Sequence, residues 1–366
     1  MSGRAIEEEV LFSCAGGVGR ILINRPQALN ALSLDNYRKI GPVLARFGQD
    51  RTIHAVTIRG LGGRAFCAGG DLRALYEAAF GVGGDRLLPA RFFAEEYKVI
   101  RAVHRFRKPY LAIIDGLTMG GGAGMSVNGS FCLATEKTLF AMPETGIGLF
   151  PDVGASRFLN RAPGRTGLYL ALIGARLQAA DALYCGFATH FLPQERVEDF
   201  VALIERISWV EGNEDRQVRA ALDRFAADPG PAPLALLQGV IDRTFCGGSV
   251  EAILDALERE ERDAGAFALW AREARARLLA KSPSSLKITL RQLEIGRGFE
   301  IEEALSLEYR MVRHVLEAHD FYEGVRAVVI DKDAKPSWRP GSLAEIDEKG
   351  VQSYFATIGE EELSFP

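Results

Sequence analysis

Three consecutive glycines follow a short apolar run, and this arrangement constrains the fold more than any other feature of the chain. The apolar run spans residues 110–114, and the glycines are Gly120, Gly121 and Gly122. Glycine lets the chain turn sharply and lets a ligand reach the backbone without a Cβ in the way. Free N–H groups in the first turn of a helix attract negative oxygens. The pattern predicts a strand, a tight turn and a short buried helix that begins beside a ligand.

A second glycine-rich turn, A-G-G-D at residues 68–71, follows another predicted strand at residues 53–59. Each turn could be no more than a tight bend that leaves a strand. The spacing matches neither a P-loop nor a dinucleotide-binding fingerprint, and residues 124–128 lack the closing glycine of a nucleophile elbow. If one N–H from each turn converges on the same oxygen, the two turns form an oxyanion hole.

Two acidic residues, Glu144 and Asp152, lie in an otherwise apolar segment. An unpaired carboxylate is costly to bury, so their positions suggest a reaction centre. A structural alternative stays open for Asp152, which could cap a helix that begins at Val153. Glu95 and Glu96 could likewise belong to the exposed face of a helix. The acids and the two glycine turns together indicate an active site.

The order of predicted elements is that of an α/β protein with parallel strands. A hairpin (10–23), a helix (33–47) and a strand (53–59) come first, then a helix from Asp71, a helix (91–106), a strand (110–114) and the glycine helix. Short helices follow at 153–160, 165–172 and 179–184, with a last strand at 187–192. We expect a catalytic core over residues 1–195 and a mainly helical region over residues 196–366.

Composition excludes several classes of function. The 366 residues are 48% hydrophobic and 25% charged, with a net charge of −4, which are ordinary globular values. No basic surface for nucleic acid is indicated, and no apolar run approaches the roughly 18 residues of a membrane span. The first ten residues resemble neither a secretory nor an Arg-rich transit signal. We therefore expect a soluble, cytoplasmic protein that binds neither nucleic acid nor membrane.

The cysteines and histidines indicate no metal site. The five cysteines have no metal-ligand spacing, and their apolar or small neighbours predict buried, reduced thiols. They are Cys14, Cys67, Cys132, Cys185 and Cys246. The five histidines fall in no motif. We expect neither a metal nor histidine catalysis.

With these residues assembled, the chain resembles the crotonase (enoyl-CoA hydratase/isomerase) superfamily, and within it most closely the 3-hydroxyisobutyryl-CoA hydrolase subgroup. The early motifs are I-N-R-P-Q-A-L-N-A-L (23–32), A-F-C-A-G-G-D-L-R (65–73), F-F-A-E-E-Y (92–97) and T-M-G-G-G-A-G-M-S-V (118–127). The longest match is A-T-E-K-T-L-F-A-M-P-E-T-G-I-G-L-F-P-D-V-G (134–154). Two late motifs are S-P-S-S-L-K-I-T-L-R-Q-L (282–293) and H-D-F-Y-E-G-V-R-A-V-V-I-D-K-D (319–333). The likeness covers nearly the whole chain and is loose only over residues 195–280.

The resemblance implies a layered β-β-α superhelix core and hydrolysis of a short 3-hydroxyacyl-CoA, with 3-hydroxyisobutyryl-CoA of valine breakdown as the expected substrate. It implies no cofactor, because CoA is part of the substrate, and a trimer-based homo-oligomer is possible. The implied catalytic residues are Glu144, Asp152, and the N–H groups of Gly70 and Gly121 that hold the thioester oxygen. The implied substrate-binding residues are Glu96 in the acyl pocket and Ala28, Ala68 and Leu72 along the adenosine part of CoA.

One departure separates the subgroups. Hydratases of this superfamily carry a second catalytic glutamate shortly after the glycines, where this chain has Gly124. Hydration needs acid and base groups on both sides of the double bond, so its loss argues for hydrolysis. An enoyl-CoA hydratase or isomerase is the alternative enzyme, and a non-catalytic CoA-ester-binding or assembly subunit is the alternative of another class. The sequence leaves open whether Glu144 acts as a nucleophile or as a general base.

Overall fold

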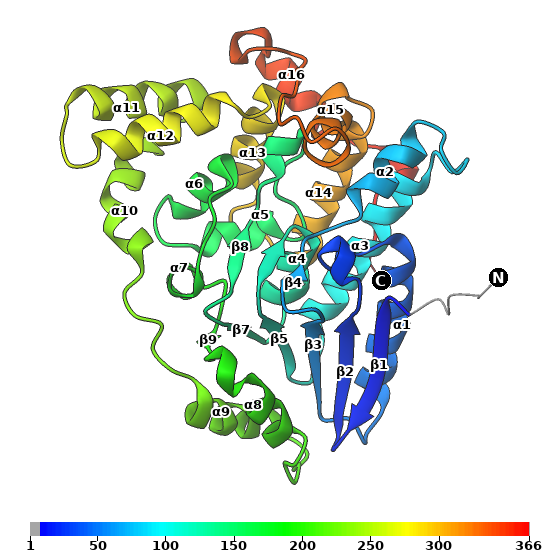
Figure 1. The fold of residues 1–366 in the computed structure, drawn as a ribbon. Helices are drawn as coiled ribbons and strands as arrows, with labels where there is room; N and C mark the ends of the chain where they lie inside the picture. The colour runs from blue at the N-terminus through cyan, green and yellow to red at the C-terminus, as the bar shows by residue number, and fades with distance from the viewer. Residues whose placement is uncertain (1–7, 366) are drawn as a thin grey trace.

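The computed structural model describes residues 8–365. The first seven residues, which hold most of the segment in which we predicted no targeting signal, lie outside the described part. Within that part, no helix is both long enough and apolar enough to span a membrane. Figure 1 shows the strands, which belong to the N-terminal half of the chain, in the lower part of the view. Most of the C-terminal helices gather above them.

A six-stranded sheet has the order β1-β2-β3-β5-β7-β9, antiparallel between β1 and β2 and parallel elsewhere. Its strands are β1 (Val10–Ala15), β2 (Val18–Ile23), β3 (Ala55–Gly60), β5 (Tyr110–Ile114), β7 (Phe131–Ala134) and β9 (His190–Phe191). All five residues of β5 are buried, as expected for a parallel strand that is covered on both faces. The predicted hairpin and the strand at 110–114 are confirmed.

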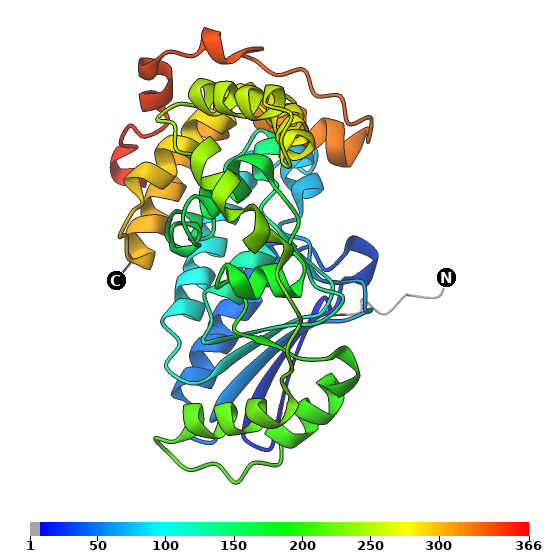
Figure 2. The same cartoon turned by 90° about the vertical axis from the view of Figure 1, so that its left-hand side faces the viewer.

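Alternate residues of these strands enter two separate cores. Ile58, Ala112 and Ile114 point into the larger core, whereas Leu111 and Ile113 point into the smaller one. This separation follows from the two-residue side-chain period of a strand. Helices α1 (Leu34–Gln49) and α3 (Leu88–His104) cover the first face, and α8 (Val197–Ile204) and α9 (Glu214–Phe225) cover the second (Figure 2).

Three short parallel strands form a second sheet in the order β4-β6-β8. They are β4 (Ala65–Cys67), β6 (Leu117–Met119) and β8 (Leu139–Ala141). The sequence analysis did not find them, because a three-residue strand has too few positions to show a period. The two sheets and the helices between them confirm the predicted α/β fold class.

Helices α1 and α2 (Leu72–Ala79) carry the predicted start signals. Ser33 caps α1 by accepting a hydrogen bond from the Asn36 N–H, and Asp71 caps α2 by accepting one from the Ala74 N–H. The glycine helix is α4 (Gly121–Val127), and it is buried throughout except at its last residue. Both glycine turns therefore lead from a short strand of the small sheet into a helix.

The rest of the described chain is mainly helical. The shorter elements before residue 200 are η1 (Pro26–Ala28), η2 (Glu144–Ile147), α5 (Ala155–Phe158), η3 (Leu159–Arg161), α6 (Thr166–Ile173), α7 (Ala179–Tyr184) and η4 (Gln194–Arg196). The later helices are α10 (Pro233–Thr244), α11 (Val250–Arg262), α12 (Ala268–Leu279), α13 (Pro283–Ile295), α14 (Ile301–Val315), α15 (His319–Val325), the π-helix η5 (Arg326–Ile330), η6 (Leu343–Glu345), α16 (Glu348–Ser353) and η7 (Gly359–Glu361). A domain boundary near residue 195 stays a prediction.

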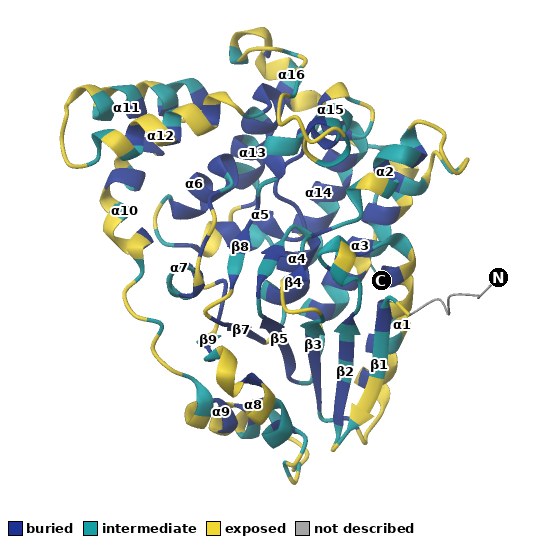
Figure 3. Ribbon diagram, viewed as in Figure 1, coloured by how far each residue is buried: buried dark blue, intermediate teal, exposed yellow. Residues whose placement is uncertain are grey.

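Buried residues run through the sheet and the inner helices, and exposed ones gather on the outer faces of α9 to α12 (Figure 3). One expectation about burial is wrong. All five cysteines are free, but Cys14 and Cys246 are exposed. Cys14 lies on edge strand β1, where the neighbouring Ser13 is exposed as well, so small neighbours did not indicate burial there.

Candidate active site

The carboxyl ends of β4, β6 and β8 meet at one cavity of about 70 Å³. The segments that leave these strands supply Ala68 to Gly70, Gly120 and Gly121, and Pro143 and Glu144 to its lining. Ligands of parallel α/β sheets bind beyond the carboxyl ends of the strands. The small sheet therefore explains why motifs far apart in the sequence lie together.

Two backbone N–H groups beside this cavity are unpaired. Among the described residues, neither the Gly70 N–H nor the Gly121 N–H has a hydrogen-bond acceptor. Gly121 is the first residue of α4, where an N–H has no partner within the helix. The turns are in contact, because a Cβ on Gly69 would lie 3.7 Å from the Gly121 nitrogen. Gly69 and Gly120 have φ values of 104° and 49°, which favour glycine.

Glu144 is the first residue of η2 and is 4% exposed. Its Oε2 atom is buried and has no hydrogen-bond partner among the described residues. Its Oε1 atom faces the second turn, because a Cβ on Gly120 would lie 3.3 Å from it. Burial, followed by the charge of Asp152, raises the pKa of Glu144 well above its usual value, and the Lys281 ammonium opposes this increase. A carboxyl with an unpaired oxygen and a raised pKa is a strong base once it is ionised.

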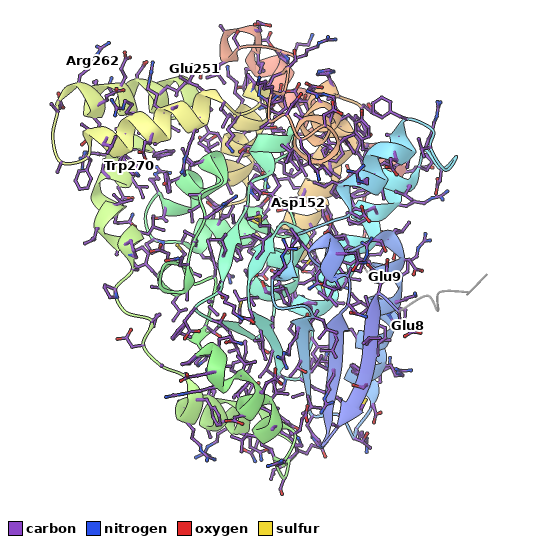
Figure 4. The ribbon with its side chains drawn as sticks, in the orientation of Figure 1. Glu8, Glu9, Asp152, Glu251, Arg262 and Trp270 are labelled. Carbon is purple, nitrogen blue, oxygen red and sulfur yellow. The ribbon has the colours of Figure 1, made fainter. Side chains whose placement is uncertain are left out.

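Asp152 lies in the centre of the molecule beside α4 and α14 (Figure 4) and lines the same cavity. The hydroxyl of Tyr97 donates a 2.8 Å hydrogen bond to its Oδ2 atom. Burial raises the pKa of Asp152 to about 7, although this hydrogen bond lowers it. The capping alternative is wrong, because α5 is capped by Gly154 without a side-chain hydrogen bond.

Glu96 also lines the cavity and is 2% exposed, so its assignment to an exposed helical face is wrong. The Tyr37 hydroxyl donates a 2.6 Å hydrogen bond to its Oε1 atom. Burial, then the charge of Asp152, raises the pKa of Glu96 well above its usual value. A Cβ on Gly121 would overlap both oxygens of this pair. Glycine is therefore required at this position by the Tyr37–Glu96 pair.

A buried network behind Asp152 was not predicted. Glu308, on α14, accepts hydrogen bonds from the Gly154 N–H (2.7 Å), the Ser156 N–H (2.9 Å) and the Ser156 hydroxyl (2.7 Å). Between Asp152 and these donors, Val153 has a φ of 55°, a strained conformation for a β-branched residue. The Asn128 amide holds the Val153 carbonyl at 3.0 Å. The network keeps the Asp152 loop in a conformation that it would not adopt alone.

Gly124, where hydratases carry their second glutamate, has no space for a side chain. A Cβ there would lie 2.6 Å from the Val153 Cβ and 2.8 Å from the Ile100 Cδ1. Backbone and packed side chains would have to move to admit even an alanine. The cavity therefore has one glutamate at the end of β8 and none on α4.

The remaining predicted residues are only partly brought together. Ala68 and Leu72 line the cavity, but Ala28 does not. Ala28 lies on η1, next to Leu29, whose carbonyl accepts a hydrogen bond from the Ala68 N–H. Over residues 8–365, no group of three or more potential ligands could hold a metal ion. No histidine of that part lines the cavity.

Sequence reasoning missed Tyr37, Tyr97, Glu308 and Lys281. Tyr97 and Glu96 both fall in F-F-A-E-E-Y, and that motif is the signal that could have revealed Tyr97. Glu308 is 152 to 154 positions from its partners, and nothing local marks it.

The fold and the site define a class of α/β enzyme that places backbone donors and buried carboxyls at the ends of parallel strands. The chain belongs to the enoyl-CoA hydratase/isomerase family, whose family model matches residues 18–355. Members of this family act on CoA thioesters, and binding of an acyl-CoA is a property of the family fold.

Curated relatives and solved structures cover nearly the whole chain. The chain is 45% identical to the 3-hydroxyisobutyryl-CoA hydrolase of Danio rerio over 99% of its length and 93% of the relative, and 42% identical to that of Homo sapiens over 98% and 91%. A carnitinyl-CoA dehydratase from Mycobacterium thermoresistibile is 37% identical with a TM-score of 0.87, over 98% of this chain and 99% of the other. An enoyl-CoA hydratase from Rhodobacter sphaeroides 2.4.1 is 36% identical with a TM-score of 0.86, over 98% and 100%.

These comparisons correct the expected location. The hydrolases of Danio rerio and Homo sapiens are both named as mitochondrial. This finding contradicts the cytoplasmic location predicted from the first residues and the cysteine content. Cysteine content does not determine this location, because buried reduced thiols are equally stable wherever the surroundings are reducing.

Proposed function

We propose that this chain hydrolyses a short-chain 3-hydroxyacyl-CoA thioester, with 3-hydroxyisobutyryl-CoA as its substrate. Water adds to the thioester carbonyl, the carbon–sulfur bond breaks, and the products are the free hydroxy acid and CoA. The names of the relatives, at 41–45% identity over nearly the full chain, support this reaction. The place of this reaction in valine breakdown is part of the proposal and rests on the resemblance of the sequence to the hydrolase subgroup.

The two unpaired N–H groups would bind the thioester oxygen. Negative charge develops on that oxygen as the carbonyl is attacked, and fixed donors in a dry site stabilise it strongly. Loss of one such donor typically raises the barrier by about 2.7–4 kcal/mol. The free N–H groups of Gly70 and Gly121, on touching turns, support this assignment.

Glu144 would be the principal catalytic carboxylate, and Asp152 would hold the attacking water or the 3-hydroxyl of the substrate. A carboxyl with a raised pKa is a stronger base once it is ionised. Glu96 would line the acyl pocket, and Ala28, Ala68 and Leu72 would lie along the adenosine part of CoA. No cofactor beyond the CoA of the substrate is invoked, and a trimer-based homo-oligomer stays a prediction.

The lack of space for a side chain at Gly124 is the observation that favours hydrolysis over hydration. Two solved structures similar to this chain are named as a dehydratase and a hydratase, so hydration of an enoyl-CoA is the second candidate. Hydration needs a second acid or base on the opposite side of the double bond. Val153 and Ile100 occupy the position from which that glutamate would extend.

The two candidates differ in a direct assay. We expect free thiol to appear when the protein is incubated with 3-hydroxyisobutyryl-CoA, and crotonyl-CoA to keep its enoyl absorbance. The variant Glu144→Gln should lower thiol release by roughly 10²–10⁴-fold, the usual contribution of a general base. Glu95→Gln is the matched control, because Glu95 points away from the cavity toward Lys98. Hydration of crotonyl-CoA without thiol release would reject the proposal.

The role of Glu144 can be tested by isotope. Either Glu144 activates water as a general base, or it attacks the thioester to form a mixed anhydride. Single-turnover hydrolysis in ¹⁸O-water followed by mass spectrometry of the Glu144 peptide detects an anhydride that water opens at the Glu144 carbon, because label then enters Glu144. Water that opens the anhydride at the acyl carbon labels only the free acid, as general-base catalysis does, so trapping with hydroxylamine completes the test: a Glu144 hydroxamate supports the anhydride, and an unmodified, unlabelled Glu144 supports the general base.

A further inference from the structure

We propose that Phe92 is the residue that restricts this site to short acyl chains, by closing it off from a second, larger cavity. This inference rests on the proposed function, because it concerns the acyl group of the same substrate. It names a specificity-determining residue and the class of substrate that its removal would admit, which is a 3-hydroxyacyl-CoA with a long alkyl chain.

The second cavity has a volume of about 320 Å³, against about 70 Å³ for the catalytic cavity. It lies between the first turns of α1, α2 and α3, and its apolar lining includes Leu34, Leu75, Leu88 and Phe92. Among the described residues, Phe92 alone lines both cavities. The Phe92 side chain is therefore a wall that the two cavities share.

Packing holds this ring in place. Phe92 is 2% exposed, and its ring lies edge-on to those of Tyr37 and Phe93, with centroids 5.5 and 5.3 Å away. The end of the ring faces the first glycine turn, since a Cβ on Gly70 would lie 2.5 Å from the Phe92 Cζ. Aromatic pairs in this arrangement are favourable beyond their buried area. The ring is thus a fixed wall beside the Gly70 N–H.

The lining of the second cavity suits an alkyl chain. Leu75 is buried there, and Leu34 and Leu88 are partly buried against the same core. Three of its charged members are paired: Asp35 with Lys39 (2.8 Å), Asp71 with Arg25 (2.9 Å) and Asp85 with Arg91 (3.1 Å). The fourth, Arg38, is exposed. Burial of an alkyl chain against apolar walls contributes about 0.8 kcal/mol of binding free energy for each methylene group.

The ring also explains why a short acyl group is the fitting one. The ring of Phe92 lines the catalytic cavity and packs on Tyr37 of α1, so it limits the cavity on that side. One extra methylene in a closed apolar pocket changes specificity by roughly 10–200-fold. With Phe92 in place, a long chain has to displace a packed ring or leave its alkyl part in water.

The test compares thiol release from 3-hydroxyisobutyryl-CoA and 3-hydroxyoctanoyl-CoA by the native chain, Phe92→Ala, Phe92→Leu and Leu88→Ala. We expect the native chain to prefer the short thioester. Phe92→Ala should raise kcat/KM for the long thioester relative to the short one on the order of tenfold or more, and Phe92→Leu should lie between. Leu88→Ala enlarges the second cavity one helical turn away but leaves the ring, so its ratio should match that of the native chain.

Each outcome decides the proposal. An unchanged ratio in both Phe92 variants overturns it, as does a native chain that already hydrolyses the long thioester as well as the short one. An equal gain in Leu88→Ala overturns it too, because the ring would then not be the barrier. If the native chain releases thiol from neither thioester, the proposed hydrolysis is wrong. The barrier role of Phe92 is then tested by the affinity for the long thioester. Isothermal titration must then show that Phe92→Leu or Phe92→Ala binds 3-hydroxyoctanoyl-CoA more tightly than the native chain does, or the barrier role is wrong.

Discussion

At the scale of single residues, the hydrogen bond from Tyr97 is the contact that tunes Asp152. Burial would keep Asp152 protonated, and the Tyr97 hydroxyl favours its ionised form. A hydrogen bond to a charged group contributes about 1.5–3 kcal/mol, and about 1.4 kcal/mol corresponds to one pH unit. Removing the hydroxyl should therefore raise the pKa of Asp152 from about 7 to a higher value.

Tyr97→Phe tests this contact. If ionised Asp152 takes part in hydrolysis, the acidic limb of the pH profile of kcat/KM should move to higher pH by about one to two pH units. Activity at pH 6 should then fall more than activity at pH 9. Tyr309→Phe is the control, because the Tyr309 ring packs on Tyr97 with centroids 6.3 Å apart but its hydroxyl does not reach Asp152. An acidic limb that stays in place would show that Tyr97 does not tune the site.

The thiols give a second prediction at this scale. Burial raises the pKa of the Cys67, Cys132 and Cys185 thiols to about 12, whereas Cys14 and Cys246 are exposed. Only the thiolate reacts rapidly with a disulfide reagent. In native protein at pH 8, Ellman's reagent should therefore titrate two of the five thiols rapidly, and all five in denaturant. The variant Cys246→Ser should reduce the rapid count to one, and a rapid count of five in native protein would contradict the burial.

At the scale of elements, α14 fixes the Asp152 loop through one side chain. Burial raises the pKa of Glu308 to about 8, although three donors from the start of α5 lower it. The folded state therefore binds this proton more tightly than the unfolded chain does. Its contribution to stability is complete below the ordinary glutamate pKa of about 4.3 and is lost as pH rises through about 8.

Glu308→Gln should remove this pH dependence. The native chain should lose stability between pH 5 and pH 8, at up to about 1.4 kcal/mol for each pH unit from this group. The variant lacks one acceptor and should be about 1–3 kcal/mol less stable at pH 5, with a smaller difference at pH 8. Urea unfolding at the two pH values measures both. Glu317→Gln, at an exposed position just beyond α14, is the control, and an equal loss at both pH values would contradict the linkage.

The elements also explain what the sequence could predict. Strand β5 and helix α1 were found because their signals are local, an apolar run in one and the Ser33 cap in the other. Strands β4, β6 and β8, which assemble the site, have three residues each and no visible period. Glu144, Asp152, Gly70 and Gly121 were found because they lie in long motifs. Glu308 and the conformation of Val153 depend on contacts from α14 and α4, which no local pattern carries.

At the scale of the molecule, the large sheet separates the active site from a second core. The cavity lies at the ends of the small sheet, on the side of α3 and α4. The smaller core lies on the opposite face of the large sheet, where α8 and α9 cover Leu111 and Ile113. The candidate site and the packing of the smaller core therefore depend on different faces of the same strands.

Phe200 on α8 allows these two contributions to be separated. Its side chain is fully buried in the smaller core and packs on Phe225, with ring centroids 5.8 Å apart. Phe200→Ala should lower the free energy of unfolding by about 3–5 kcal/mol, through lost burial and the cavity left behind. Leu236→Ala, at a side chain that is 79% exposed, should change it by less than about 0.5 kcal/mol. Urea unfolding measures both variants.

The kinetics of Phe200→Ala test whether packing in the smaller core is independent of catalysis. At a temperature where Phe200→Ala is still folded, we expect kcat and KM for 3-hydroxyisobutyryl-CoA to equal those of the native chain. The reason is that Gly70, Gly121 and Glu144 are placed by β4, β6 and β8, and these strands pair with one another rather than with the large sheet. A fall in kcat that tracks the loss of stability would mean that the sheet transmits packing on α8 to the cavity, and the two faces would then have to be treated as one cooperative unit.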